Sequence, residues 1–595
     1  MNNKHSRWYG MASLLVVAIA PALTYQFAPP IHAQVISDGT LSTTVTAPDN
    51  QNFVIEAGDR TGNNLFHSFS EFSISTNGSA VFNNAIDIKT IFSRVTGTNI
   101  SNIDGLMQTN GDASLFLLNP NGILLGPNAR LDIGGSFFGT TADTLQFDDD
   151  NSFSTTEPVT SSLLSIGVPA GLQWTQTPNP IVMQNATLEG APDTNLALLG
   201  GDLTLRDSTL MTTDGRIILG GLGAAGTVQL EGVDSVNFSD EVRRGDVILS
   251  DASDVSVETG SIDIFSRTLT LSDKSRLATV TSSQNAGGNI TLNVEDGIEL
   301  TESAIESLTF GAGDAGNIVV KTRQLRLIGS DITASTSATG NAGDIGIQAQ
   351  DSVELDTNSS TGNITSISSI VNMGASGAGG EIEIKTFALH TLDGSQIAAV
   401  NSGSGESGNI VITVSELVDL RGISEFIVGS LVRTNFSSIL TTSSSNSTVA
   451  SGNVTVTTEQ LNIMDGAQIS TSPFGASDGG TVIIVARDSI NITGRGPDTT
   501  PISSGIFTGP QFIDSSGDGG DIILRTGQLQ VADGGLVLAI AGESGNGGNI
   551  IIDADFVKLN TGSIFADSLG EGDAGDLRIV ASQIVSVENL SRIDV

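Results

Sequence analysis

A glycine followed by a polar and then an apolar residue recurs through the carboxyl-terminal half of this chain. Neighbouring copies, such as Gly288-Asn289-Ile290 and Gly316-Asn317-Ile318, lie about 28 residues apart. The copies begin at Gly260, Gly288, Gly316, Gly343, Gly380, Gly408, Gly452, Gly480, Gly520, Gly548 and Gly575. A fixed period in this range indicates a solenoid, in which each repeat packs on its neighbours.

Within each repeat, apolar residues alternate with polar ones. After Gly288 the alternation covers residues 290–294 and 298–300, and a third short run opens at Ile305. A period of two predicts strands with one apolar face, so we expect three strands per repeat. Stacked coils would bury that face in one continuous column. The sequence therefore predicts an all-β, right-handed parallel β-helix of the pectin-lyase type, a β-solenoid with about 28 residues per coil.

Three repeats are longer than the others, those that begin at Gly343, Gly408 and Gly480. We place the additional residues after the second strand of each coil, which would put the resulting loops along one flank of the column. Loops held by a rigid scaffold often bind partners, and apolar residues in such loops need burial or a partner. The candidate binding residues are Phe426, Leu431, Phe436, Phe507 and Phe512.

Three segments match the G-x-G-x-x-G pattern of dinucleotide-binding sites: 311–316, 403–408 and 570–575. That fingerprint requires a helix directly after the glycines, whereas each of these segments runs into a predicted strand. We therefore interpret the glycines as turn residues with positive φ between coils.

The composition argues against several kinds of chemistry. The formal net charge of -40 argues against nucleic acid as a partner. The chain also has no cysteine. After residue 33 the histidines are His67 and His390, so histidine-based triads and zinc sites have little material. Acidic turns such as Asp518 with Asp521 lack the spacing of a known calcium loop. We expect no cofactor, no metal and no enzymatic activity.

The amino terminus has the order of a secretory signal peptide. Lys4 and Arg7 precede an apolar stretch over 11–28, and Ala33 provides a small residue at a cleavage site. We therefore expect export and cleavage after Ala33. The predicted divisions are a signal peptide at 1–33, a first domain at 34–178, irregular β-helix coils at 179–259 and repeat coils at 260–595.

Several motifs after the signal peptide occur in an order and spacing known from one family. They are residues 34–40, Leu65-Phe66-His67-Ser68-Phe69-Ser70-Glu71-Phe72, Ala80-Val81-Phe82-Asn83-Asn84, Arg94-Val95-Thr96-Gly97, Ser101-Asn102-Ile103-Asp104-Gly105, Leu115-Phe116-Leu117-Leu118-Asn119-Pro120-Asn121-Gly122-Ile123 and Gly134-Gly135-Ser136-Phe137. This segment resembles the amino-terminal haemagglutination-activity (TPS) domain of filamentous-haemagglutinin-like exoproteins of two-partner secretion.

The resemblance implies a route of secretion. Such proteins cross the inner membrane through the Sec translocon, and an outer-membrane TpsB-type β-barrel transporter then recognises the amino-terminal domain and passes the chain outward from the periplasm. Asn119, Pro120, Asn121, Gly122 and Ile123 match the family's secretion motif. Pro120 fixes φ and Asn121-Gly122 tolerates positive φ, so we expect a tight corner between two strands.

Three functions from different classes agree with these features. The first is a secreted exoprotein of the surface of a Gram-negative-type bacterium, adhesive through an unknown cell-surface or polysaccharide ligand. The second is a β-helix enzyme that processes polysaccharides, which would be expected to use aromatic sugar platforms; Trp174 is the one tryptophan after residue 33, and tyrosine is absent there. The third is an acidic, calcium-dependent extracellular matrix protein. We favour the first.

Overall fold

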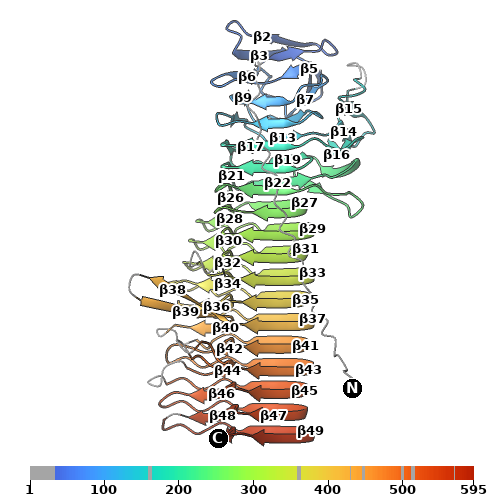
Figure 1. Cartoon of the computed structure of the whole chain (residues 1–595). Coiled ribbons are helices and arrows are strands. Elements are labelled where there is room, and N and C mark those ends of the chain that lie inside the picture. The colour runs from blue at the N-terminus through green and yellow to red at the C-terminus, as the bar shows by residue number, and fades with distance from the viewer. Residues whose placement is uncertain are drawn as a thin grey trace, which may run out of the picture.

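The computed structural model describes residues 34–158, 164–357, 363–428, 431–444, 449–497, 501–510, 516–568 and 570–595, without the side chains of 426–432. These residues form one tall column of stacked coils (Figure 1). Parallel strand pairs connect each coil to the next along the column. The fold is the predicted right-handed parallel β-helix. Within the described ranges, no helix could span a membrane.

Each repeat contributes one long strand and one short strand. The long strands are β27 (Ser261–Leu271), β29 (Ile290–Thr301), β31 (Ile318–Ile328), β33 (Ile345–Asp356), β35 (Ile382–Leu392), β37 (Ile410–Arg421), β41 (Val454–Met464), β43 (Val482–Thr493), β45 (Ile522–Ala532), β47 (Ile550–Asn560) and β49 (Leu577–Glu588). The short strands are β28 (Arg276–Thr281), β30 (Ala304–Thr309), β32 (Asp331–Thr336), β34 (Ser366–Val371), β36 (Gln396–Asn401), β40 (Ser438–Ser443), β42 (Gln468–Thr471), β44 (Gly505–Thr508), β46 (Leu536–Ala541), β48 (Ser563–Ser568) and β50 (Arg592–Asp594).

The prediction of three separate strands per repeat is wrong. The first and second strands are continuous and bend within one long strand, as in β29, where the pairing with β31 shifts register between Asn293 and Gly297. Pairing on both sides of the bend keeps most backbone groups of the corner within the ladder.

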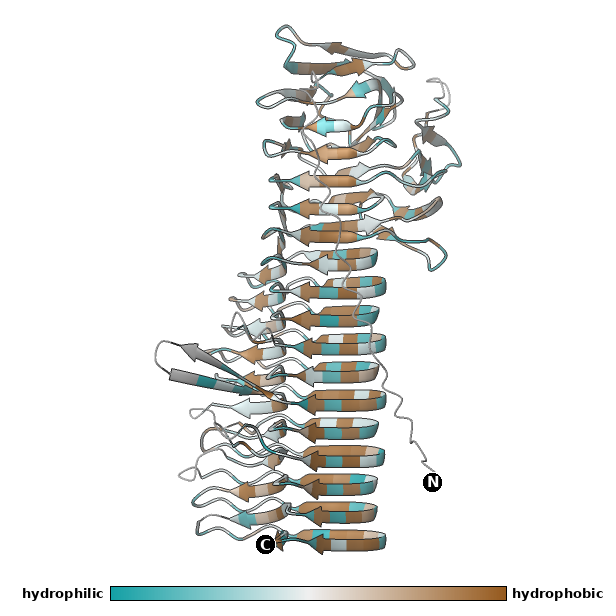
Figure 2. Ribbon diagram, in the orientation of Figure 1, coloured by the Kyte–Doolittle hydropathy of each residue, from teal (hydrophilic) through white to brown (hydrophobic). Residues whose placement is uncertain are grey.

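The apolar alternation places one side chain of every pair inside the column. Ile290, Leu292, Ile298, Leu300 and Ile305 are all at most 2% exposed and belong to one hydrophobic cluster that runs through the coils. Figure 2 shows the alternation as bands of hydrophobic and hydrophilic residues along the long strands. The prediction of a continuous buried column is confirmed.

The repeat glycines are required by the close approach of successive coils. A Cβ atom on Gly316 would overlap the carbonyl of Gly288, and one on Gly343 would overlap the carbonyl of Gly316. None of the glycines in 311–316, 403–408 and 570–575 has a positive φ. The interpretation of these glycines as positive-φ turn residues is therefore wrong, because the constraint is backbone packing between coils.

The asparagine or aspartate that follows seven of the repeat glycines has its own structural role. The side-chain oxygen of Asn289 accepts a hydrogen bond from the backbone N–H of Asn317 at 2.8 Å, and that of Asn317 accepts one from Asp344 at 2.8 Å. Asp521, after Gly520, accepts in the same way from the backbone N–H of Asn549. Asp518, three residues earlier in the same turn, accepts from the backbone N–H of Asn546. These side chains satisfy backbone donors that the corner would otherwise leave unpaired.

The amino-terminal coils are less regular. Their strands are β1 (Val35–Ser37), β2 (Thr43–Thr46), β3 (Asn52–Ala57), β4 (Asp59–Thr61), β5 (Asn64–Phe72), β6 (Ser79–Phe82), β7 (Thr90–Val95), β8 (Ser101–Ile103), β9 (Leu106–Thr109), β10 (Ser114–Leu118), β11 (Ile123–Leu125), β12 (Arg130–Asp132), β13 (Phe137–Thr140), β17 (Ile181–Gln184), β18 (Thr187–Glu189), β19 (Leu196–Gly200), β20 (Leu203–Arg206), β21 (Thr209–Thr213), β22 (Arg216–Gly221), β25 (Val247–Ser250) and β26 (Asp254–Glu258). The antiparallel pairs β1–β5 and β2–β3 lie at the amino-terminal end of the column.

A separate antiparallel sheet covers one side of these coils (Figure 1). It consists of β14 (Thr144–Phe147), β15 (Ser152–Ser154), β16 (Pro169–Trp174), β23 (Gly226–Glu231) and β24 (Ser235–Asn237). Under it lies a second hydrophobic cluster, in which the rings of Phe66, Phe92, Phe116 and Phe138 follow one another, with centroids 5.1, 5.3 and 4.4 Å apart. The strands between the two clusters are therefore buried on both faces.

The three insertions leave the coil at the same corner, between the long and the short strand. They occupy residues 357–365, 422–437 and 494–504, and the second contains the antiparallel hairpin of β38 (Ile423–Val428) and β39 (Leu431–Phe436). Figure 1 shows this hairpin projecting from the side of the column where the short strands lie. The prediction that the insertions share one flank is confirmed.

The prediction that all the additional residues follow the second strand is wrong in part. In a regular coil, the hydroxyl of Ser307 donates to the carbonyl of Gly316, nine residues later. The corresponding hydroxyls of Thr441 and Thr508 reach glycines eleven and twelve residues later. A few residues of each insertion therefore follow the short strand.

Candidate export site

The predicted secretion motif forms the corner between β10 and β11. The N–H of Gly122 donates to the carbonyl of Asn119 at 3.1 Å, which closes a turn with Pro120 and Asn121 at its centre. Gly122 has a φ of 120°, whereas Asn121 does not have a positive φ. Ile123 begins β11 and is 3% exposed. The motif thus forms a tight corner, with glycine alone in the left-handed region.

The side chain of Asn119 is fully buried and makes four hydrogen bonds. Its Nδ2 donates to the carbonyl of Asn99 at 3.0 Å and to the hydroxyl of Ser101 at 2.9 Å. Its Oδ1 accepts from the backbone N–H and from the side-chain Nδ2 of Asn121, at 3.0 and 2.9 Å. Because every polar group of the amide is used, no isosteric apolar residue could replace it without leaving buried partners unpaired.

The corner is also joined to the coils on either side. Asn121 Nδ2 donates to the carbonyl of Gly97 at 2.8 Å, and Asn179 Nδ2 donates to the carbonyl of Pro120 at 2.8 Å. Gly97 belongs to the motif at 94–97, so these bonds bring together two motifs that are separate in the sequence.

Arg94 is a buried cation at the centre of a hydrogen-bond network that the sequence did not predict. Its guanidinium donates to the hydroxyl of Ser68 and the carbonyl of Ser154, each at 2.8 Å, and to the hydroxyl of Thr40 at 3.1 Å. It also lies 4.5 Å from the ring centroid of Phe153. Burial lowers the pKa of Arg94 to about 10, which still leaves it charged at neutral pH. Arg94 thereby joins the segment around Thr40, the motif at 65–72 and the covering sheet.

Asp38 is the carboxylate nearest to this network. Burial alone would raise its pKa, but hydrogen bonds donated by Ser68, Thr40 and Thr96 outweigh burial and hold the pKa below its usual value. The hydroxyls of Ser68 and Thr96 lie 2.6 and 2.7 Å from Asp38 Oδ2. Asp38 is therefore ionised at neutral pH and joins its own segment to Ser68 and Thr96 in the neighbouring coils.

His67 is buried at the amino-terminal end of the column. Its Nδ1 lies 3.2 Å from the hydroxyl of Thr43, and its ring lies beside those of Phe69 and Phe82. Burial lowers the pKa of His67 to about 4, and the charge of Asp59 opposes that shift only in part. The ring is neutral at physiological pH and serves as a packed core residue.

Two of the five candidate binding residues have described side chains, Phe436 and Phe507. Phe436 is half-buried at the base of the hairpin, paired with Ile423. Phe507 belongs to the regular short strand β44, so its placement in an insertion is wrong. Phe512 and the side chains of Phe426 and Leu431 lie outside the described residues.

Comparison with known proteins identifies the amino-terminal part of the chain. Residues 33–264 match the family described as the TPS secretion domain. Among solved structures, the HMW1 secretion domain from Haemophilus influenzae is 18% identical over 64% of this chain and 94% of its own length, with a TM-score of 0.47. A filamentous hemagglutinin secretion domain is 16% identical over 56% of this chain and 99% of its own, with a TM-score of 0.26. No curated protein matches.

The family match includes every motif that forms the corner and the Arg94 network, and it ends where the regular repeat begins. A TPS secretion domain implies a TpsB outer-membrane transporter as partner and secretion from a Gram-negative bacterium. Residues 33–264 of this chain therefore form a TPS secretion domain, the domain by which two-partner secreted exoproteins are exported.

Proposed function

We propose that this exoprotein is an adhesin that catalyses no reaction and attaches its cell to a surface through the flank that carries the insertions. After the Sec translocon has moved the chain into the periplasm and the signal peptide has been cleaved, the TPS domain directs it through the outer-membrane transporter. The observation that carries the adhesive role is the hairpin β38–β39, which projects sideways from a rigid column (Figure 1).

The base of the hairpin is fixed to the column. The N–H of Gly394 donates to the hydroxyl of Ser437 at 2.9 Å, and that hydroxyl donates to the carbonyl of Arg421 at 2.7 Å. A Cβ atom on Gly394 would lie against Ser424 and Asn435. An element held in this way can present its outer part to a partner without a large ordering cost.

The hairpin interrupts a corner that is otherwise regular. In the coil that begins at Gly316, Gly329 and Ser330 join the two strands, and Ser330 donates to the carbonyl of Ile328 at 2.8 Å. Gly422 and Ser437 make the same corner around the hairpin, and both corner glycines have a positive φ. Removing Ile423–Phe436 would therefore leave a Gly-Ser corner already present in this protein.

This deletion gives a direct test. Cells that produce the full chain together with its transporter are compared with cells that produce the deleted form, for surface protein and for attachment to host cells and abiotic surfaces. We expect equal amounts of surface protein and weaker attachment by the deleted form. If cells with the full chain and cells with the deleted form attach equally, the hairpin is not the adhesive element. If cells without the protein attach as well as cells with the full chain, the protein is not an adhesin.

A further inference from the structure

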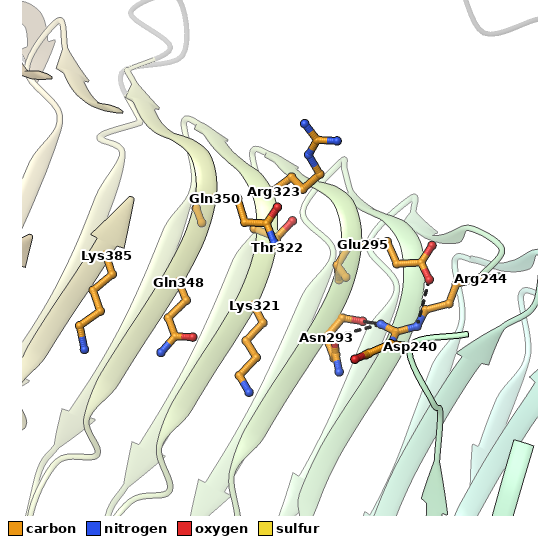
Figure 3. A pocket seen from close by; sticks show the side chains of 12 residues that line it. Asp240, Arg244, Asn293, Glu295, Lys321, Thr322, Arg323, Gln348, Gln350 and Lys385 are labelled. Atoms are coloured by element: carbon orange, nitrogen blue, oxygen red, sulfur yellow. Dashed lines mark hydrogen bonds and ion pairs between the residues drawn. The ribbon is translucent and has the colours of Figure 1, made fainter. Parts of the chain in front are cut away.

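An open groove with a volume of about 690 Å³ crosses the outer face of the long strands from β29 to β35 (Figure 3). Lys321, Gln348 and Lys385 lie in a row on successive strands, as their register pairing requires. Neighbouring coils are about 4.8 Å apart, so the two lysines are about 10 Å apart along the column axis. The row continues to Asn293, which pairs with Lys321.

The end of the groove nearest the amino terminus is a fixed wall. Arg244 is 3% exposed and donates to the backbone carbonyl and the side-chain oxygen of Asn293, at 2.6 and 2.9 Å. Its guanidinium lies about 6 Å from the rings of Phe238 and Phe265, and its Nε is 3.5 Å from Glu295. The groove is thus formed before any ligand arrives. The Arg-Gly-Asp tripeptide at 244–246 is not displayed as a recognition motif, since its arginine is buried.

The charge of the groove differs from that of the chain. Lys321 is exposed and forms no ion pair within the described part of the chain, and Lys385 is half-exposed beside Glu383, with 2.5 Å between Nζ and Oε1. Arg323 points away from the row and pairs with Asp351 at 2.8 Å. The acids among the lining residues, Asp240 and Glu295, lie at the Arg244 end (Figure 3). On a chain with a net charge of -40, this row is a local site for carboxylates.

From the groove we infer that the protein binds a linear acidic polysaccharide, a polymer of uronic acids, along the row from Asn293 to Lys385. The lysines would contact carboxylates on sugars spaced along the chain, and the amides of Gln348, Gln350 and Asn293 can both donate to and accept from hydroxyls. This inference goes beyond the adhesive role proposed above, because the groove lies on the long strands and not on the flank that carries the insertions.

Other ligand classes fit the groove less well. An acidic peptide would find no free strand edge, because the groove crosses strands that are paired on both sides, and Val294 and Ala349 are each 3% exposed and offer little apolar surface. A neutral polysaccharide would find no aromatic ring among the residues that line the groove. Charge and hydrogen bonding are what the groove provides.

The test uses the mature chain, residues 34–595, with fluorescent oligogalacturonate as the probe. The groove variant carries Lys321→Gln and Lys385→Gln. The control variant carries Arg525→Gln and Lys558→Gln, which remove the same charge from two exposed positions in β45 and β47. We expect the groove variant to bind about tenfold more weakly at low ionic strength, since each exposed ion pair contributes up to about fivefold. The control variant should bind as the unmodified chain does.

A second variant separates this role from folding. Gln348→Glu keeps both lysines and places a carboxylate between them, so it should abolish binding while the melting temperature stays unchanged. Absence of oligogalacturonate binding to the unmodified chain, equal loss in the groove and control variants, or equally tight binding of dextran or polyglutamate would each overturn the inference. Oligogalacturonate binding that persists unchanged in the groove variant would also overturn the inference, whereas loss of attachment in the hairpin deletion would not bear on it.

Discussion

Gly343→Ala tests the reason for the repeat glycines. The added methyl would overlap the carbonyl of Gly316 in the preceding coil, where both partners are backbone and no side chain can move aside. To make room, the two coils must separate at this corner. That movement would lengthen three hydrogen bonds, those of the Ile318, Asp344 and Ala315 N–H groups, now 2.8 to 2.9 Å long.

The size of the effect follows from those bonds. At about 1 kcal/mol for each, the substitution should destabilise the coil by about 3 kcal/mol. Gly346→Ala is the matched control, because no atom lies within 4 Å of its added methyl and Gly346 does not have a positive φ. In a strand, alanine loses less backbone freedom than glycine, so the control should be neutral or stabilising by up to about 1 kcal/mol.

Hydrogen exchange in the mature chain measures the effect coil by coil, which suits a solenoid whose coils open separately. We expect the amides of Ile318 and Ala315 to lose protection in Gly343→Ala and to keep it in Gly346→Ala. Equal protection in the two variants would refute the argument that backbone packing, rather than turn conformation, selects these glycines.

Three further predictions concern the export site and the hairpin. Asn119→Ala with Asn121→Ala should remove the bonds to Asn99 and Ser101 and leave the protein degraded in the periplasm; normal surface protein by protease accessibility would contradict this. His67 binds protons more weakly in the folded chain than in the unfolded one. The contribution of His67 to the free energy of unfolding should therefore be fully present above pH 6.5 and decrease by up to about 3 kcal/mol as the pH falls towards 4. Urea titrations of His67→Gln should lack this decrease. Deleting Ile423–Phe436 should change the urea midpoint little, whereas a large decrease would show that the hairpin supports the column.

The repeat coils could be predicted from the sequence because the alternation of apolar and polar residues determines which side chains are buried. Alternation over 290–294 and 298–300 specifies an inward and an outward face, and the period specifies the size of a coil. The close contact between Gly288 and Gly316 could not be predicted, because it depends on how two coils approach each other. Turn conformation and backbone packing both select glycine, and the sequence alone does not distinguish them.

The second hydrophobic cluster was not predicted, although a signal for it exists. Leu115-Phe116-Leu117-Leu118 breaks the alternation with four apolar residues in a row. Leu115 and Leu117 point into the column, whereas Phe116 and Leu118 pack beneath the covering sheet. An uninterrupted apolar run therefore marked a strand buried on both faces. Arg94 gave no comparable signal, since its partners come from segments up to 60 residues away.

The side-chain hydrogen bonds between successive coils all point the same way along the column. In each hydrogen bond between residues that follow repeat glycines, the side-chain acceptor belongs to the earlier coil and the backbone donor to the later one. Examples are Asn289 to Asn317, Asn409 to Asn453 and Asp521 to Asn549. A coil that has already folded thus presents fixed oxygens to the chain that follows it. If the column folds from its amino-terminal end, each new coil meets a prepared edge, and its own asparagine or aspartate then accepts from the next coil.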